Sequence, residues 1–283
     1  MLARATSDLK AASGMVAPPL PFAMKPFFFG PSTQPRFGLL HPPAGEQARR
    51  TGVLLCYPGT QEYNISHWAF RKLAGLLARA GFPVLRFDWA GTGDSAGEIA
   101  GGRVSTWIED VGLAAQELKD AAEVQRISLV GMRLGAALAA RAVAGGVAAE
   151  DLVLWEPVLS GRKYLAELEA LDRHELERLL HPGAAGPEEL GGYPFTREMR
   201  ADLEALDAAA QPPRGARRVW LFTDRAHPEV EQVQQAWAAA GLTVSARVVQ
   251  DKASVTGGGA REAAALYTTV LGEITTRLSE GAA

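Results

Sequence analysis

The sequence predicts an α/β fold in which a mostly parallel, doubly wound sheet carries an inserted helical cap. The first observation behind this prediction is the alternation of short apolar runs with amphipathic segments, which is typical of right-handed strand–helix–strand units. The second is a strand, a sharp turn and an alanine-rich helix at residues 127–143. The third is a charged segment at residues 160–213 that interrupts the alternation and is expected to cover the sheet.

The composition permits one large core and excludes several classes of function. The chain has 283 residues, of which 47% are hydrophobic and 22% charged, and this suits one α/β domain with an insertion. A net charge of −3 offers no basic surface for a nucleic-acid backbone, so we expect no nucleic-acid partner. The single cysteine, Cys56, excludes an intramolecular disulfide and a cysteine-based zinc cluster, and it suits a reducing, cytoplasmic location. No apolar run reaches the ~18 residues of a membrane span.

The first 23 residues differ in composition from the rest of the chain. Residues 1–23 are rich in alanine, serine and proline and lack a long apolar centre. This composition supports neither a secretory signal nor a membrane anchor, and Met24 is an alternative start. We therefore expect a disordered extension at 1–23 and an α/β core at 24–159 and 214–283.

The first half of the core is expected to begin with an antiparallel edge hairpin and to continue with two parallel strands around one helix. The strands are short runs of aromatic, aliphatic or β-branched residues bounded by glycine, proline or polar residues. We place the hairpin strands at 27–29 and 36–40, the parallel strands at 52–57 and 83–88, and the helix at 68–80. Residues 58–63 predict a polar loop between the first parallel strand and the helix.

The second half continues the alternation on both sides of the insertion. Its strands are apolar runs expected to be buried on both faces, and its helices show apolar residues at helical spacing. We place strands at 127–131, 152–155, 218–224 and 243–249, core helices at 105–122, 229–240 and 261–278, an elbow helix ending near 143, and cap helices at 164–180 and 196–206.

The turn inside residues 127–143 is the most informative motif of the chain. Gly131-Met-Arg-Leu-Gly135 keeps both glycines of the G-x-S-x-G nucleophile elbow of α/β-hydrolases, which let strand and helix backbones approach closely. Arg133 stands in the place of the nucleophilic serine. An arginine is neither nucleophile nor base near neutral pH, but it can hold a carboxylate or phosphate through two hydrogen bonds.

A glycine-rich turn at residues 91–97 does not predict a nucleotide site. It lacks the G-K-[ST] ending of a P-loop and the G-x-G-x-x-G spacing of a dinucleotide site. With no other cofactor or metal-ligand pattern in the sequence, we expect neither a cofactor nor a metal.

Five motifs together resemble one family of enzymes. They are Lys25-Pro-Phe-Phe-Phe-Gly-Pro-Ser32, Leu85-Arg-Phe-Asp88, Gly91-Thr-Gly-Asp-Ser-Ala-Gly97, Gly131-Met-Arg-Leu-Gly-Ala136 and Leu154-Trp-Glu-Pro157. From Met24 onward the chain resembles the α/β-hydrolases, and more narrowly the serine-aminopeptidase-like hydrolases associated with exosortase systems. Several members of that group also carry arginine at the elbow. The resemblance implies an α/β-hydrolase fold with a cap after the sixth strand.

The resemblance also implies places for a Ser–Asp–His triad, of which two are not filled. Asp224 matches the usual acid position, and Glu156 matches the alternative one. Arg133 replaces the serine, and no histidine follows Val249. Without a positioned base, a serine loses most of the ~10²–10⁴-fold gain of general-base catalysis, so serine-triad chemistry is not expected. His227 is interpreted as a solvated loop histidine.

The remaining candidates are polar groups expected above the carboxyl ends of the strands. Backbone N–H groups of the loop from Gly59 to Tyr63 and of Leu134 correspond to the two donors of an oxyanion hole. We expect substrate binding by Gly59, Thr60, Tyr63, Arg133 and Leu134, and catalysis by Glu62, Glu156 and Asp224. Because a buried cation needs a partner, Arg133 is expected to be held by Glu156, Asp224 or both.

Two hypotheses about function follow from these residues. The first is a hydrolase-fold protein that handles a small molecule with an acyl or carboxylate group, through triad-independent acid–base chemistry or activated water. The second is a catalytically inactive pseudo-hydrolase that acts as a binding or scaffold protein. An unpaired carboxylate in a cleft favours the first, whereas a closed pair of Arg133 with a carboxylate and a filled pocket favours the second. The sequence leaves the substrate, the pathway and a homodimer open.

Overall fold

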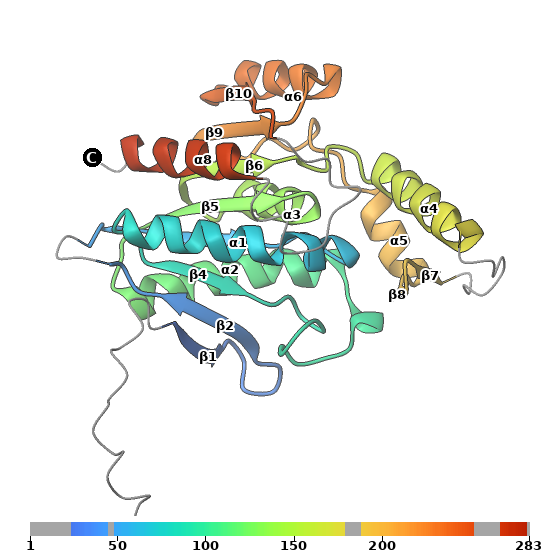
Figure 1. The fold of residues 1–283 in the computed structure, drawn as a ribbon, viewed down its shortest axis with the longest axis horizontal. Helices are drawn as coiled ribbons and strands as arrows, with labels where there is room; N and C mark the ends of the chain where they lie inside the picture. The colour runs from blue at the N-terminus through green and yellow to red at the C-terminus, as the bar shows by residue number, and fades with distance from the viewer. Residues whose placement is uncertain (1–23, 45–47, 179–187, 252–266, 282–283) are drawn as a thin grey trace, which may run out of the picture.

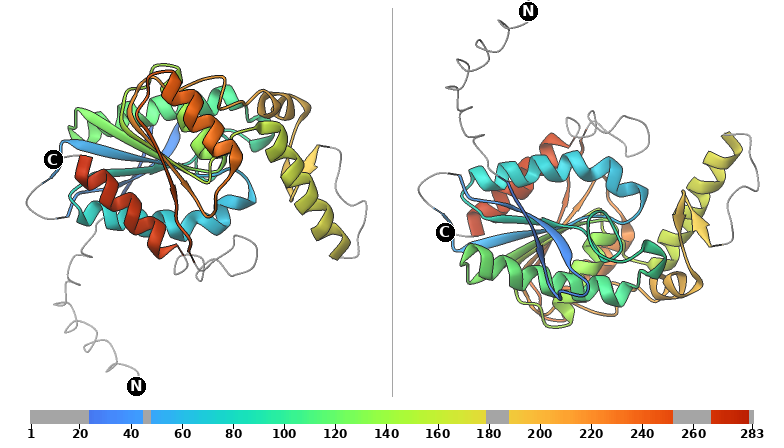
Figure 2. Two further views of the ribbon diagram at one scale, coloured as in Figure 1. Left: turned by 90° about the horizontal axis from the view of Figure 1, so that it is seen from above. Right: turned by 90° about the horizontal axis from the view of Figure 1, so that it is seen from below.

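The computed structural model describes residues 24–44, 48–178, 188–251 and 267–281, and it confirms the predicted α/β architecture. A single eight-stranded sheet lies between helices on both of its faces (Figures 1 and 2). Its strands are β1 (Lys25–Phe29), β2 (Arg36–His41), β3 (Thr51–Cys56), β4 (Val84–Phe87), β5 (Arg126–Met132), β6 (Ala149–Trp155), β9 (Ala216–Thr223) and β10 (Val244–Val248). The predicted extension at residues 1–23 lies outside the described residues.

The strand order explains why the central strands are almost wholly buried. The order is β1-β2-β4-β3-β5-β6-β9-β10, in which β1 and β2 are antiparallel and the strands from β4 to β10 are parallel. All six residues of β3 are buried, because helices cover both faces of a parallel sheet. The predicted edge hairpin is thus confirmed as β1 and β2.

Two helical layers bury the two faces of the sheet. The helices that flank it are α1 (Gln61–Arg79), α2 (Val104–Ala122), α3 (Leu134–Ala144), α6 (Pro228–Ala239) and α8 (Thr268–Gly281), with a short 3-10 turn at Ile99–Gly101. Buried residues of α1 and α8 form one apolar cluster with one face of the sheet. Those of α2, α3 and α6 form a second cluster on the opposite face. The predicted final helix is described only from Thr268, because residues 252–266 lie outside the described part of the chain.

The start of α1 differs from the prediction. The sequence placed this helix at 68–80 and residues 58–63 in a loop, but α1 begins at Gln61. Its first turn carries polar residues, which conceal the apolar periodicity, and an acidic Glu62, which favours a helix N-terminus electrostatically. Glu62 and Tyr63 are therefore held on a helix rather than on a flexible loop.

Four elements lie between β6 and β9, where the insertion was expected. They are α4 (Gly161–Arg178), β7 (Glu189–Leu190), β8 (Tyr193–Pro194) and α5 (Arg197–Glu204). Figure 1 shows them set to one side of the sheet. The β7–β8 pair is a small separate sheet that the sequence analysis did not predict. None of the described helices is both long and apolar enough to cross a membrane.

The elbow brings β3, β5 and α3 into direct backbone contact. A Cβ atom added at Gly135 would lie 2.2 Å from the carbonyl oxygen of Tyr57 and 2.4 Å from that of Cys56. A Cβ atom at Gly131 would lie 2.6 Å from the Cα atom of Ala136. Both glycines are required because no side chain fits between these backbones, as the sequence motif indicated.

Candidate active site

Arg133 occupies the corner between β5 and α3. Its backbone has φ 52° and ψ −121°, a conformation that is unfavourable for a residue with a side chain and that is common at functional turns. The N–H of Arg133 donates to the carbonyl of Trp155, and its own carbonyl accepts from the N–H of Val158. Both bonds tie the corner to the end of β6, so the arginine side chain starts from a fixed position at the carboxyl ends of the strands.

The Arg133 side chain lies in a cluster with Glu62, Tyr164 and Glu167, which we call the Arg133 cluster. Its Nε donates to Glu62 Oε1 at 2.7 Å, and its Nη2 donates to Glu167 Oε2 at 2.7 Å. The phenol of Tyr164 donates to Glu62 Oε2 at 2.9 Å, and the Tyr164 ring centroid lies 5.5 Å from Arg133 Cζ. The cluster therefore joins the elbow, the first turn of α1 and helix α4 of the insertion.

The prediction that Glu156, Asp224 or both hold Arg133 was wrong. Neither Glu156 nor Asp224 contacts it. The parallel register aligns Trp155 of β6 with Phe222 of β9, and Glu156, which has φ 45°, turns towards β9. There Glu156 Oε1 accepts a hydrogen bond from the backbone N–H of Asp224. The cation is held instead by Glu62 and by Glu167 of α4, a residue that no motif in the sequence marked.

The cluster is electrostatically stable. Burial acts to lower the pKa of Arg133, but attraction to Glu62 and hydrogen bonds to Glu167 and Glu62 outweigh it, so the pKa is raised and the guanidinium stays charged. Burial and the negative charge of Glu62 raise the pKa of Tyr164 well above its usual value, so its phenol remains a donor. Each oxygen of Glu62 accepts a hydrogen bond within the cluster, so this carboxylate serves first as the partner of Arg133.

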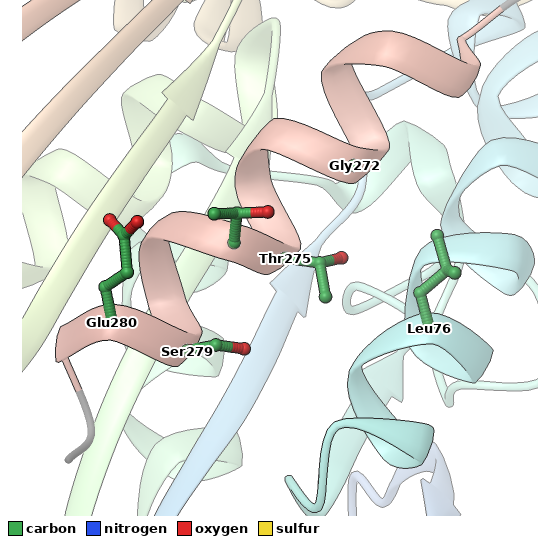
Figure 3. A pocket seen from close by; sticks show the side chains of 6 residues that line it. Leu76, Gly272, Thr275, Ser279 and Glu280 are labelled. Atoms are coloured by element: carbon green, nitrogen blue, oxygen red, sulfur yellow. The ribbon is translucent and has the colours of Figure 1, made fainter.

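A pocket of about 230 Å³ adjoins the Arg133 cluster. It is lined by residues that follow β6, by one side of α4, by the end of β9 and by the start of α6, and they include Arg133, Glu156, Tyr164, Thr223 and His227. A second cavity, of about 520 Å³, is an open groove between α1 and α8 and is lined by none of the candidate residues (Figure 3). Of these two cavities, the pocket beside Arg133 is the one that contains candidate residues.

Glu156 is the carboxylate best placed to act in this pocket. Burial raises its pKa above the ordinary value of 4.5, and the nearby charge of Asp224 adds to this effect. The hydrogen bond from the Asp224 backbone works in the opposite direction. The side chain of Asp224 is more exposed, with 59% of its surface accessible. A carboxyl group with a raised pKa at a pocket wall is typical of acid–base residues.

The two segments expected to supply the oxyanion-hole donors lie side by side. Leu134 is the first residue of α3, so its N–H has no acceptor within the helix. A Cβ atom at Gly59 would lie 3.1 Å from Leu134 Cδ2, which places the loop before α1 against the elbow. Thr60, with φ 58°, ends that loop.

Tyr63 does not join these groups as expected. Its ring centroid lies 4.8 Å from that of Tyr57, and its phenol is hydrogen-bonded to Asp88. Burial is the main cause of its raised pKa. Tyr57 follows β3 and Asp88 follows β4, and neither lines the pocket beside Arg133. The predicted role of Tyr63 in substrate binding therefore has no support from this geometry.

His227 was interpreted as a solvated loop histidine, but it lines the pocket. It is the N-cap residue of α6, and its Nε2 lies 3.7 Å from Asp224 Oδ1. Each of Glu156, Asp224 and His227 offers one ligand atom, and these atoms lie within 4.8 Å of one another. The only feature of the sequence that could have indicated this role of His227 was its position, three residues after Asp224 and just before the predicted helix.

Comparisons with known proteins agree with this fold. The sequence profile of the family described as serine aminopeptidase, S33, matches residues 49–207, which is more than half of the chain. A putative hydrolase of Agrobacterium vitis superposes with a TM-score of 0.56 at 18% identity, covering 93% of this chain and 100% of the other. No curated protein matches the sequence significantly.

Two further structures of named enzymes are similar. An esterase of Pyrococcus furiosus gives a TM-score of 0.60 at 14% identity, covering 92% of this chain and 90% of the other. A proline iminopeptidase of Mycobacterium smegmatis gives 0.57 at 13% identity, covering 90% and 97%. At these identities the likeness concerns the fold alone.

Proposed function

The chain belongs to the serine aminopeptidase S33 family of α/β-hydrolases, and from that premise we propose that it handles a small acyl compound by acid–base chemistry without a serine triad. The observation that carries the proposal is that Arg133 and Glu156 have different surroundings at the site. Arg133 fills the place of the nucleophile and is closed by two glutamates, whereas Glu156 faces the adjoining pocket with a raised pKa. In this proposal the protein keeps a pocket and an acid–base group that could act on an acyl compound, but it lacks the serine that the fold usually uses.

The charges around the pocket favour a neutral acyl group over a carboxylate. Arg133 is already paired with Glu62 and Glu167, and Lys163 is paired with Glu229. Glu156 adds a further carboxylate to the wall. An anionic ligand would meet these carboxylates without an unpaired cation among the described pocket residues to compensate it.

The protein is expected to be inert toward fluorophosphonate probes, which label activated serines. The elbow holds Arg133, and residues 228–283 contain no histidine that could act as the base. Labelling is read by intact-protein mass spectrometry, with a serine hydrolase of the same fold as the positive control. The variant Arg133→Ser should also stay unlabelled, because it restores the nucleophile but not the base. Stoichiometric labelling of any serine in the unmodified protein would contradict the proposal.

Hydrolysis of p-nitrophenyl acetate tests the role of Glu156. We expect Glu156→Gln to lower kcat/KM by about 10²-fold, in the range that general acid–base groups contribute. As a base, Glu156 must be ionised, so the rate should fall as the pH drops through its pKa, above 4.5. Glu231→Gln, in the first turn of α6, is the matched control and should keep the full rate. Equal turnover by all three proteins would place any activity outside this pocket.

The alternative function is that of a pseudo-hydrolase that binds a ligand or partner without turnover. It is favoured by the closed state of the Arg133 cluster, in which both glutamates already satisfy the cation. No hydrolysis of the acetate ester above the background rate, at any pH from 5 to 9, would reject the enzymatic proposal and leave this alternative.

We also propose that residues 160–213 act as a helical cap on a core of residues 24–159 and 214–283. The contacts of Tyr164 and Glu167 with the Arg133 cluster support this division. The single, buried Cys56 supports the proposed cytoplasmic location, since a chain without disulfides suits a reducing compartment. The homodimer stays a prediction.

A further inference from the structure

We propose that Glu156, Asp224 and His227 form a binding site for a divalent transition-metal ion of the Zn²⁺ or Mn²⁺ class. The three residues come from separate places in the chain: the end of β6, the end of β9 and the N-cap of α6. The topology brings them together at the carboxyl ends of β6 and β9, where Glu156 and His227 line the pocket. The inference goes beyond the proposed function, because binding of an ion requires no turnover.

The geometry is close to that of a coordinated ion. Zinc binds nitrogen and oxygen ligands at about 2.0–2.2 Å, which places tetrahedral ligand atoms roughly 3–3.6 Å apart. Asp224 Oδ1 and His227 Nε2 are 3.7 Å apart, and one ligand atom from each of the three residues lies within 4.8 Å of the others. Asp224 is the most exposed of the three, so its side chain has room to adjust to a bound ion.

The donor set distinguishes this group from a surface cluster of acids. One imidazole and two carboxylates are typical ligands of zinc and manganese, and three protein ligands leave a coordination position open. The backbone N–H of Asp224 donates to Glu156 Oε1 and fixes that carboxylate, which leaves its second oxygen available. The open position would face the pocket, where a bound ion lowers the pKa of a coordinated water.

The local charges favour a cation at this place. Among the described residues of the pocket, Arg133 and Lys163 are each paired with other glutamates. Arg225 Nε lies 3.9 Å from Asp224 Oδ1, but its side chain is exposed. A divalent ion would supply the positive charge that Glu156 and Asp224 lack, with less desolvation cost than leaving the half-buried Glu156 uncompensated.

Isothermal titration of ZnCl₂ and of MnCl₂ into the EDTA-treated full chain, prepared without a histidine tag, tests the inference. We expect one ion per chain for at least one of the two metals. Glu156→Gln and His227→Gln should each weaken binding at least about tenfold, since even groups that only orient metal ligands have effects of this size. Asp224→Asn, at an exposed position, gives the same test without risk to folding, and Glu231→Gln is the control that should bind as the wild type does.

Two results would overturn the proposal. One is the absence of saturable binding by either metal; the other is binding that persists unchanged in the Glu156, Asp224 and His227 variants, since the ion would then lie elsewhere. Ester hydrolysis by the EDTA-treated protein separates this proposal from the previous one. Turnover without added metal supports Glu156 as a base even where no ion binds.

Discussion

Replacing Gly135 by alanine is expected to lower the free energy of unfolding by about 3 kcal/mol or more. The added Cβ would lie 2.2 Å from the carbonyl oxygen of Tyr57 and 2.4 Å from that of Cys56. These are backbone atoms at the end of β3, in the centre of the sheet, so they cannot move aside as a flexible side chain would. Overpacking usually costs ~1–3 kcal/mol, and a backbone clash lies at or above the upper end. Urea denaturation followed by circular dichroism measures the change.

Gly112→Ala is the matched control for this substitution. Gly112 lies within α2, and a Cβ there would meet only Val147 Cγ2, at an ordinary distance of 3.9 Å. Because alanine is favoured over glycine inside helices, this variant should be more stable than the wild type by about 0.5–1 kcal/mol. Should Gly135→Ala be as stable as Gly112→Ala, the close contact between α3 and β3 would be refuted.

Arg133→Met is expected to destabilise the protein by about 2–4 kcal/mol. The substitution leaves Glu62, whose side chain is 12% exposed, without its cation, and among the described residues the Tyr164 phenol is then its remaining side-chain hydrogen-bond partner. Breaking a fully buried pair costs ~3–5 kcal/mol, and the partial exposure of this pair reduces the figure. The double variant Arg133→Met with Glu62→Gln should be more stable than the sum of the single effects predicts, by ~1–3 kcal/mol, because it removes the uncompensated charge.

The exposed pair of Arg103 and Asp202 provides the control for this cycle. Arg103 Nε and Nη2 donate to both oxygens of Asp202, at 2.6 and 2.9 Å, and join α2 to α5. Since solvent screens exposed ion pairs, Arg103→Met should change the stability little. Additive effects of the Arg133 and Glu62 substitutions would show that their contact does not stabilise the fold. A large loss of stability in Arg103→Met would instead show that the contact of α5 with α2 contributes more to stability than the Arg133 cluster does.

Local sequence patterns were enough to predict the sheet and the elbow. Strands β3 to β6 are almost wholly buried, because helices cover both faces of this part of the sheet, so each contains a run of mostly apolar residues. The elbow was predictable because only glycine fits at positions 131 and 135. The sequence alone equally shows that Arg133 stands between the two elbow glycines and that no histidine follows Val249.

The start of α1 was not predictable from periodicity. Its first turn places Glu62 in the Arg133 cluster, and Gln61, Glu62 and Tyr63 do not repeat the apolar pattern of the later turns. Helix propensity and a favourable acidic residue therefore governed a boundary that the hydrophobic pattern did not mark. The same error placed Glu62 on a loop and concealed it as a partner of Arg133.

The partners of Arg133 and the neighbours of Glu156 were decided by tertiary structure alone. The sequence determined that an arginine stands at the elbow, that acids follow two strands, and that a charged segment lies between those strands. It did not determine which acid meets the arginine, because the pairing depends on the direction in which Glu156 turns and on where α4 lies. Glu167 and Glu62 hold the guanidinium of Arg133, although they lie 34 and 71 positions away from it in the chain. Such contacts depend on the packing of whole elements, which no local pattern of residues encodes.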